Sequence, residues 1–265
     1  MDWNRAKNII IVLLFVLNLF LLGNYLYTRQ AQANDAQTQA ELSVYLEGRG
    51  VTLSCALPKR SETGRRLMIA ESTDKLAERA LPILLGQDMR FKNGEAVSES
   101  GRISWVAGEL DGTVYTLPDG GEADLDAMLA LLSEAGIVSS SVETGEDGTV
   151  LTGLFGEPAE PVYNMRLLLH QDADGAWQIS GRWFLGTPTA AGEDSEREIA
   201  GLLVTFADRL LTQEIPLGEI SGIERGWVCA TLPSVGTQLT PAFRITTDAG
   251  VFFISALDGQ PLELN

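Results

Sequence analysis

The sequence is poor in the residues that most often build metal centres and disulfide-rich folds. Its 265 residues include one histidine, His170, and two cysteines, Cys55 and Cys229. A zinc site needs several such ligands, and a lone histidine outside an HExxH motif gives little support for one. Two cysteines far apart in the chain do not make a disulfide scaffold. The sequence leaves their state open, and two buried free thiols are favoured over a bridge.

Recognisable catalytic motifs are also missing. The chain has no GxSxG elbow, no Walker A loop and no GxGxxG fingerprint. Residues 72–75 match the S-x-x-K motif of penicillin-binding enzymes, but its SDN and KTG partner motifs are absent. Ser72 or Thr73 is more typical of a helix N-cap. We therefore expect no catalytic residue, no cofactor and no enzyme activity.

One acidic segment resembles the start of a calcium-binding loop. Residues 172–175 read Asp-Ala-Asp-Gly, but Trp183 stands where such a loop needs its final glutamate. An Asp-Gly pair between two apolar stretches is typical of a tight hairpin turn. We therefore predict a turn at this segment and no metal.

Positive charge is scarce as well. The chain carries 19 Lys and Arg against 36 Asp and Glu, a net charge of −17. Residues 1–29 hold three of the bases and one of the acids, so the remainder has 16 bases, 35 acids and a net charge of −19. A body this acidic repels nucleic acid and anionic lipid, so we expect no nucleic-acid partner. Solubility alone would account for the charge.

The one long apolar run lies near the N-terminus. Residues 9–27 are 19 residues without a charge, and at ~1.5 Å per residue they would span roughly 28 Å, about the hydrocarbon thickness of a bilayer. Arg5 and Lys7 precede the run, which favours a cytoplasmic N-terminus and a body outside the cell membrane. A cleaved signal peptide is the alternative, because residues 31–33 have the small-x-small pattern of a cleavage site. The run exceeds the ~7–15 residues of a signal core, which favours a retained single-pass anchor.

A polar side chain interrupts this apolar run. An amide at mid-membrane lacks water and seeks a hydrogen bond, and polar contacts between membrane helices are worth roughly 0.6–2 kcal/mol. Residues three or four positions apart share one face of a helix, and we expect that face of the run to contact a partner helix. This predicted interaction face consists of Ile11, Leu14, Asn18, Leu22 and Tyr25. The alternative is that Asn18 bonds its own backbone and faces lipid.

Beyond the anchor, helical patterns alternate with groups of strand-like stretches, which indicates an α+β fold of helices packed on antiparallel sheets in two lobes. The apolar spacing predicts helices at 72–85, 124–134 and 196–211. Strands are expected at 89–92, 102–106, 113–117, 149–154, 162–170, 177–185, 226–231, 243–247 and 251–256. Turn-forming pairs separate several of them, among them Asn93-Gly94, Asp111-Gly112 and Asp174-Gly175.

We divide the chain into four segments. Residues 1–29 form the cytoplasmic tip and the membrane helix, and residues 30–58 form a juxtamembrane stalk and helix. Residues 59–186 form a first α+β lobe, and residues 187–265 form a second. The acidic, glycine-containing stretch 187–196 is the expected linker between the two lobes.

Both ends of the chain carry a family resemblance. It lies in residues 1–7, which run directly into the apolar segment with Asn18 inside it, in residues 42–58, and in residues 239–245 and 251–256 with the following Asp258-Gly259. These segments resemble the YycI family, accessory proteins of the YycG (WalK) sensor histidine kinase of low-GC Gram-positive bacteria. Two features depart from the family pattern: Phe243 stands where the family tends to carry tryptophan, and the middle of the chain is unusually acidic.

The resemblance implies a non-catalytic regulator of a two-component system in cell-wall homeostasis. It implies that the membrane helix, together with a YycH-type partner, contacts the membrane helices of the kinase. It does not imply whether kinase output rises or falls. Two other functions stay open: an extracytoplasmic module that binds peptide or cell-wall fragments, which a large apolar pocket would favour, and a cell-wall enzyme, which would need a buried carboxylate pair or a Ser-Lys site in a cleft.

Overall fold

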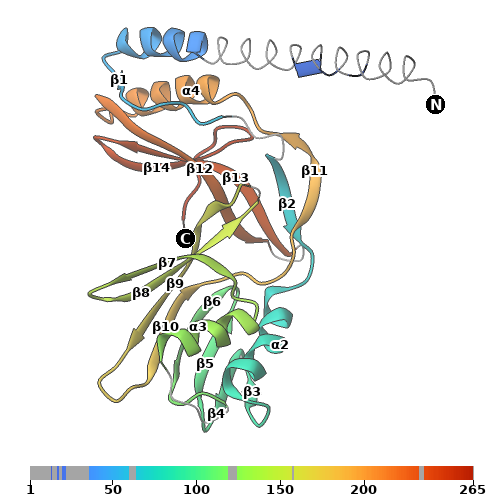
Figure 1. The fold of residues 1–265 in the computed structure, drawn as a ribbon. Coiled ribbons are helices and arrows are strands. Elements are labelled where there is room, and N and C mark those ends of the chain that lie inside the picture. The colour runs from blue at the N-terminus through green and yellow to red at the C-terminus, as the bar shows by residue number, and fades with distance from the viewer. Residues whose placement is uncertain are drawn as a thin grey trace, which may run out of the picture.

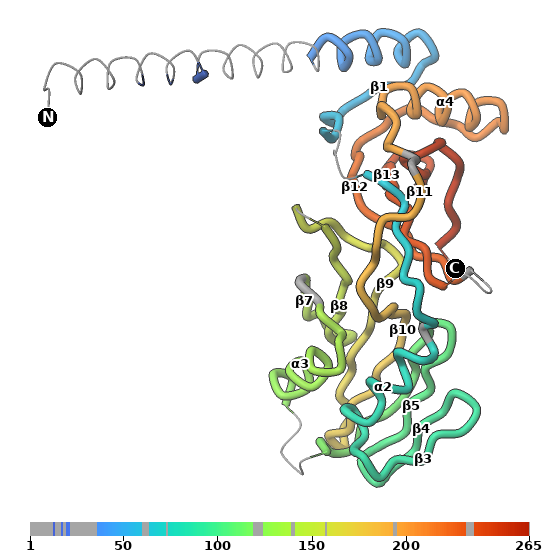
Figure 2. Tube along the Cα trace, turned by 90° about the vertical axis from the view of Figure 1, so that its right-hand side faces the viewer, coloured from blue at the N-terminus to red at the C-terminus, as the bar shows by residue number. Residues whose placement is uncertain are grey.

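The computed structural model describes residues 13, 17, 20, 21, 36–59, 64–118, 124–156, 158–232 and 236–264. These residues form an α+β fold in which helices pack on a large, mainly antiparallel sheet (Figure 1). The expected α+β class, with helices on antiparallel sheets, is therefore confirmed. The sheet falls into two halves, which lie end to end in the view of Figure 2.

The first half of the sheet is antiparallel throughout and carries two helices on one face. Its strands run in the order β7-β8-β9-β10-β6-β5-β4-β3. They are β3 (Arg90–Lys92), β4 (Glu95–Ser98), β5 (Gly101–Val106), β6 (Glu109–Val114), β7 (Ser139–Gly145), β8 (Gly148–Phe155), β9 (Glu160–Gln171) and β10 (Trp177–Arg182). The helices are α2 (Thr73–Leu85) and α3 (Leu125–Glu134).

The second half of the sheet carries the other helices. Its strands are β1 (Thr52–Leu53), β2 (Arg65–Ile69), β11 (Thr189–Ser195), β12 (Glu219–Leu232), β13 (Gly236–Thr247) and β14 (Gly250–Ser255). A helix over 36–47 and α4 (Ile199–Thr212) lie side by side on it, at the end far from α2 and α3 (Figures 1 and 2). β12 and β9 pair in parallel at Trp227 and Val162, which joins the two halves.

Each half has its own hydrophobic core, built by the alternation of side chains along its strands. In β5 the buried positions are every second residue, so Ile103 and Trp105 point inward, under α2 and α3. In the second half, Phe243 and Ile245 of β13 do the same beneath α4. A smaller cluster lies where the halves meet, and it includes Val162, Phe184, Trp227 and Cys229.

The three predicted helices are present with small shifts at their ends. Asp124, the first residue of the predicted helix 124–134, is the N-cap of α3, and its carboxylate accepts a hydrogen bond from the Ala127 amide at 2.8 Å. Ser72 occupies the N-cap position of α2, as predicted, and its side chain makes no capping hydrogen bond. The first-turn carboxylate of Asp74 instead accepts from the Ala107 amide at 3.0 Å and ties α2 to the sheet.

One predicted turn is wrong. Asp111 and Gly112 lie inside β6, and the turn that joins β5 to β6 is made by Ala107 and Gly108 at φ of 53° and 88°. The glycine at 112 serves another purpose, because a Cβ there would lie 2.7 Å from the Cα of Ile103 on the neighbouring strand. By contrast, Asn93-Gly94 joins β3 to β4 as predicted, with φ of 54° and 81°.

The segments predicted as a linker and as a stalk both pack into the second half of the sheet. The expected linker, 187–196, contributes β11, which pairs with β2. β2 falls within the range of the first predicted lobe, yet it also pairs with β13 of the second half. The helix over 36–47, expected as part of a stalk, belongs to the same core as α4, because Leu42 and Leu46 are buried there.

The predicted membrane anchor lies almost entirely outside the described residues. Of residues 9–27 the structure describes Leu13, Leu17, Phe20 and Leu21, all of them helical and 48% to 69% exposed. Within the part of the chain that the structure describes, no helix combines the length and the apolar character needed to cross a membrane.

Candidate functional site

The five residues of the predicted interaction face fall outside the described residues. They are Ile11, Leu14, Asn18, Leu22 and Tyr25. The described structure begins again at residue 36, nine residues after Tyr27 ends the uncharged run. What the structure offers next to the anchor is therefore the helix over 36–47 and its contacts.

This juxtamembrane helix, residues 36–47, docks on α4 through an apolar face. Leu42 and Leu46 are four residues apart, so they lie on the same side of the helix, and they are only 4% and 0% exposed. They join a core that includes Leu203 and Phe206 of α4. Burying a leucine side chain contributes about 1.5–3 kcal/mol, so this face holds the helix firmly against the second half of the sheet.

Three polar side chains form a clamp between the C-terminal end of the juxtamembrane helix and α4. The Asp208 carboxylate on α4 pairs with the Arg49 guanidinium and accepts a hydrogen bond from the Tyr45 hydroxyl at 3.3 Å. The Arg49 guanidinium carbon also lies 4.8 Å from the centre of the Tyr45 ring, a cation–π arrangement. The three side chains are partly exposed, so the clamp fixes the register of the two helices more than it adds stability.

The chain after this helix is also bound to the second half of the sheet. Val51 is completely buried, and its amide donates to the Leu46 carbonyl at 3.0 Å. Thr52 then pairs with Glu219 as β1 joins β12 in parallel. Residues 36–53 are thus fastened to α4 and β12 by apolar, polar and backbone contacts.

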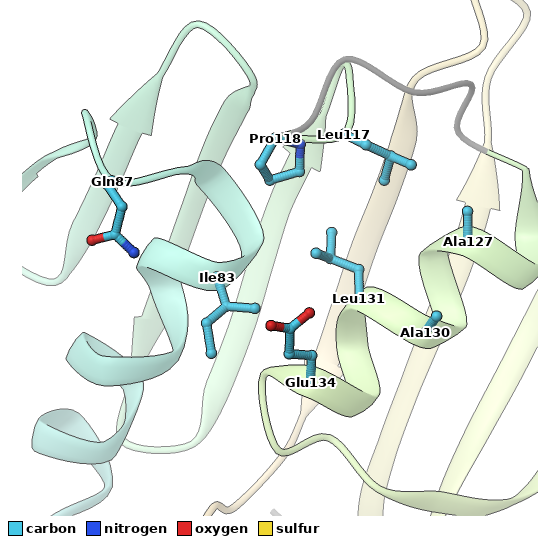
Figure 3. A pocket seen from close by; sticks show the side chains of 8 residues that line it. All are labelled: Ile83, Gln87, Leu117, Pro118, Ala127, Ala130, Leu131 and Glu134. Carbon is cyan, nitrogen blue, oxygen red and sulfur yellow. The ribbon is translucent and has the colours of Figure 1, made fainter.

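The first half of the sheet carries a groove between α2 and α3, with a volume of about 480 Å³. Its lining residues are Ile83, Gln87, Leu117, Pro118, Ala127, Ala130, Leu131 and Glu134. Ile83 of α2 faces Leu131 of α3 across the gap, and the Glu134 carboxylate extends into the space between the helices (Figure 3). The lining is mainly apolar, and the Gln87 amide and the Glu134 carboxylate are its polar groups.

The sequence explains why the two helices leave this space. Pro82 lies inside α2 directly before Ile83, and it has no amide hydrogen to donate within the helix. On the facing helix, Ala127 and Ala130 present single methyl groups where larger side chains would fill the gap. Ile83 and Leu131 are consequently only partly buried.

A second polar cluster is buried where β12 of the second half of the sheet meets the start of β9. Arg225 of β12 forms ion pairs with Glu160 at 2.5 Å and with Glu196 at 2.8 Å. A cell-wall enzyme would need a buried pair of carboxylates in a cleft. Glu160 and Glu196 are a buried pair, but the same guanidinium holds both, and neither lines the groove. This arrangement is that of a structural ion pair and gives no support to a cell-wall enzyme.

The remaining residues singled out by the sequence lie on the surface. Ser72 and Lys75 are exposed at the start of α2, and His170 is exposed at the end of β9. The Asp172 carboxylate accepts hydrogen bonds from the amides of Asp174 and Ala176 at 3.0 and 2.9 Å, which confirms the predicted turn between β9 and β10. No group of potential metal ligands occurs among the described residues.

The cysteines lie in separate places and are both free thiols. Cys229 is buried where the two halves of the sheet meet, and Cys55 packs beside the core under α4. Burial raises the pKa of both thiols, and for Cys229 the nearby Arg182 opposes this only in part. The preference for free thiols over a bridge is confirmed, whereas the expectation that both are buried holds for Cys229 and not for Cys55, which is only partly buried.

Comparisons with known proteins give little further guidance. No protein-family profile and no curated protein sequence matches the chain. An uncharacterized protein from Eubacterium rectale is similar in structure, with 10% identity over 82% of this chain and 91% of its own, at a TM-score of 0.37. The YpeB C-terminal domain of Bacillus megaterium has 11% identity over 74% of this chain and 96% of its own, at a TM-score of 0.32. Scores this low carry no argument about function.

Sequence reasoning missed the groove and the buried Arg225 cluster. Pro82 is visible in the sequence as a residue that ends or weakens helices, but the facing alanines come from a helix about fifty residues later in the chain. Nothing in the local sequence marks Glu160, Glu196 and Arg225 as partners, because only the sheet brings them together.

Proposed function

We propose that the protein is a single-pass, membrane-anchored regulator of a two-component sensor histidine kinase of the YycG (WalK) type, acting in cell-wall homeostasis signalling. In this proposal its N-terminus is cytoplasmic, its body is extracytoplasmic, and its membrane helix contacts the kinase and a YycH-type partner. The body performs no catalysis. The YycI-like segments at both ends of the chain and the uncharged run at 9–27 support the assignment.

The observation that carries the proposal is the docking of the juxtamembrane helix on α4. A flexible tether would let the anchor and the body move independently, since unstructured linkers transmit no orientation. Here Leu42 and Leu46 are buried in the core that α4 also joins, and Arg49 is paired with Asp208. A body joined so firmly to the chain that follows its anchor can pass a change in either part to the other, which is what a regulator of a membrane kinase requires.

The described residues of the apolar run agree with a lipid-facing anchor. Leu13, Leu17, Phe20 and Leu21 leave 48% to 69% of their surface uncovered by the rest of the chain. In water this would be unfavourable by about 25 cal/mol per Å² of apolar surface, whereas a bilayer or a partner helix removes the cost.

Association in the membrane tests the proposal. Energy transfer between labelled copies of this protein and a YycG-type kinase should be strong for the native chain. It should be lost when residues 1–29 are replaced by an unrelated membrane span. Asn18→Leu keeps the size and raises the hydrophobicity, so insertion should be unharmed while association weakens about fivefold, the loss of one polar contact of ~1 kcal/mol.

Two controls make the outcome readable. Leu13→Ile, a conservative change outside the predicted interaction face, should leave association unchanged. A reporter that requires export, fused after Asn265, should be active in every variant if the topology is as proposed. Unchanged association after replacement of the whole anchor would place any kinase contact elsewhere and would refute the proposed mechanism.

A further inference from the structure

We infer that the groove between α2 and α3 is a docking site for a short, apolar segment of another protein that carries a lysine or arginine. This inference is independent of the proposed kinase regulation, because the groove lies at the opposite end of the molecule from the juxtamembrane helix (Figures 1 and 2). An apolar pocket in the body is also the feature that would favour a binding module.

The shape and lining of the groove fit protein side chains. Its volume of about 480 Å³ lies within the usual range of ligand pockets, roughly 300–1,000 Å³. Ile83, Leu117 and Leu131 form apolar walls, and the small side chains of Ala127 and Ala130 on α3 leave space open on one side. An apolar side chain entering here would cover the exposed parts of Ile83 and Leu131, in the manner of an anchor residue in a helix-lined groove.

The negative charge at the groove favours an occupant that carries a positive charge. Of the eight described residues that line the groove, Glu134 is the charged one, and its carboxylate points into the space (Figure 3). Neither α2 nor α3 has a basic residue in its last turn, so the partial negative charge of each C-terminus is left without a complementary side chain there. Arg79, one turn before Ile83 on α2, is paired with Glu71.

The net charge of the whole body also favours a basic occupant. Residues 30–265 carry a net charge of −19, from 16 bases and 35 acids. A field of that sign draws in a basic segment and repels an acidic one. A sugar chain from the cell wall fits less well, because Ile83, Leu117 and Leu131 would cover its hydroxyls with apolar surface, and the described lining offers them polar partners at Gln87 and Glu134 alone.

Selection from a random peptide library displayed on phage tests the inference. The target is the full chain in detergent, with counter-selection against Ala130→Trp, whose indole fills the groove. The enriched peptides should combine apolar residues with lysine or arginine. Measured by fluorescence anisotropy, their binding should disappear with Ala130→Trp and weaken at least about tenfold with Glu134→Lys.

Matched controls separate binding from folding and from net charge. Ser133→Trp places the same indole on the exposed side of α3, and Glu78→Lys makes the same change of charge on the exposed side of α2. Both should bind as the native chain does, and circular dichroism should show the same melting for all four variants. Failure to enrich any peptide that distinguishes the native chain from Ala130→Trp would overturn the inference. Enrichment of acidic peptides would also overturn it. So would a groove that binds soluble glycan fragments and does not bind basic peptides.

Discussion

Arg225 and Glu196 form a buried ion pair, with the guanidinium Nη2 2.8 Å from the carboxylate Oε2 and with 8% and 2% of the two side chains exposed. The same guanidinium holds Glu160 at 2.5 Å. One cation therefore fastens β12 to the start of β9 and to the residue that follows β11. The Glu196 amide in turn donates to the Gly64 carbonyl at 2.8 Å, which adds the beginning of β2 to the same cluster.

Replacement of Arg225 by methionine should destabilise the protein by about 3–5 kcal/mol, because it leaves two carboxylates buried without their cation. Urea unfolding followed by circular dichroism measures the loss. Arg244→Met is the matched control, because Arg244 also pairs with a glutamate, Glu224, but the pair is 40% and 60% exposed. That variant should lose less than about 1 kcal/mol. Equal losses in the two variants would show that burial adds nothing to the Arg225 pairs.

Asp248 should contribute to the acid sensitivity of the fold. Its carboxylate accepts hydrogen bonds from the amides of Glu219 and Gly218, which lower its pKa. A depressed folded-state pKa stabilises the protein above the unfolded value of about 3.9, and that stabilisation is lost as pH falls through the folded value. Asp248→Asn should therefore show a weaker loss of melting temperature below about pH 4 than the native chain.

A second variant corrects this comparison for net charge. Glu143→Gln removes one exposed carboxylate from β7, away from these amides. If Glu143→Gln and Asp248→Asn flatten the acid limb of the melting profile equally, the backbone hydrogen bonds of Asp248 are not the cause.

The two thiols should differ in reactivity. The thiolate is the reactive form, and burial raises the pKa of both cysteines, with Cys229 also shielded inside the protein. Iodoacetamide should label Cys55 slowly in the native protein, faster as pH rises, and should leave Cys229 unlabelled. Mass spectrometry after labelling in guanidinium chloride should find both residues modified. Protection of both in guanidinium without reductant would reveal a disulfide and contradict the free-thiol state.

Gly108 should be intolerant of alanine for two separate reasons. Its φ of 88° is unfavourable for any other residue, and an added Cβ would collide with the buried ring of Phe184. Gly175 has a similar φ of 85° but open space around it, so Gly175→Ala isolates the backbone effect, about 1 kcal/mol. Gly108→Ala should cost clearly more than Gly175→Ala in urea unfolding. Equal costs would mean that Phe184 shifts without penalty.

The sequence by itself determined the elements whose signals are local. The apolar spacing of α2, α3 and α4 fixed three amphipathic helices, because a helix repeats its buried face every three to four residues. The predicted helix 124–134 began at Asp124, which is the N-cap of α3, and the partner of its carboxylate, the Ala127 amide, is three residues away. Asn93-Gly94 marked a hairpin, since few other pairs adopt two positive φ angles in succession.

Only the tertiary structure decided what depends on residues far apart in the chain. Gly112 looked like a turn residue, yet it is a glycine because the neighbouring strand approaches it at Ile103. The groove required Ile83 and Leu131 to face each other, and the buried cluster required Glu160, Glu196 and Arg225 to meet on one sheet. Sequence patterns report the period of a single element, whereas packing is decided by which faces meet, and that is a property of the whole chain.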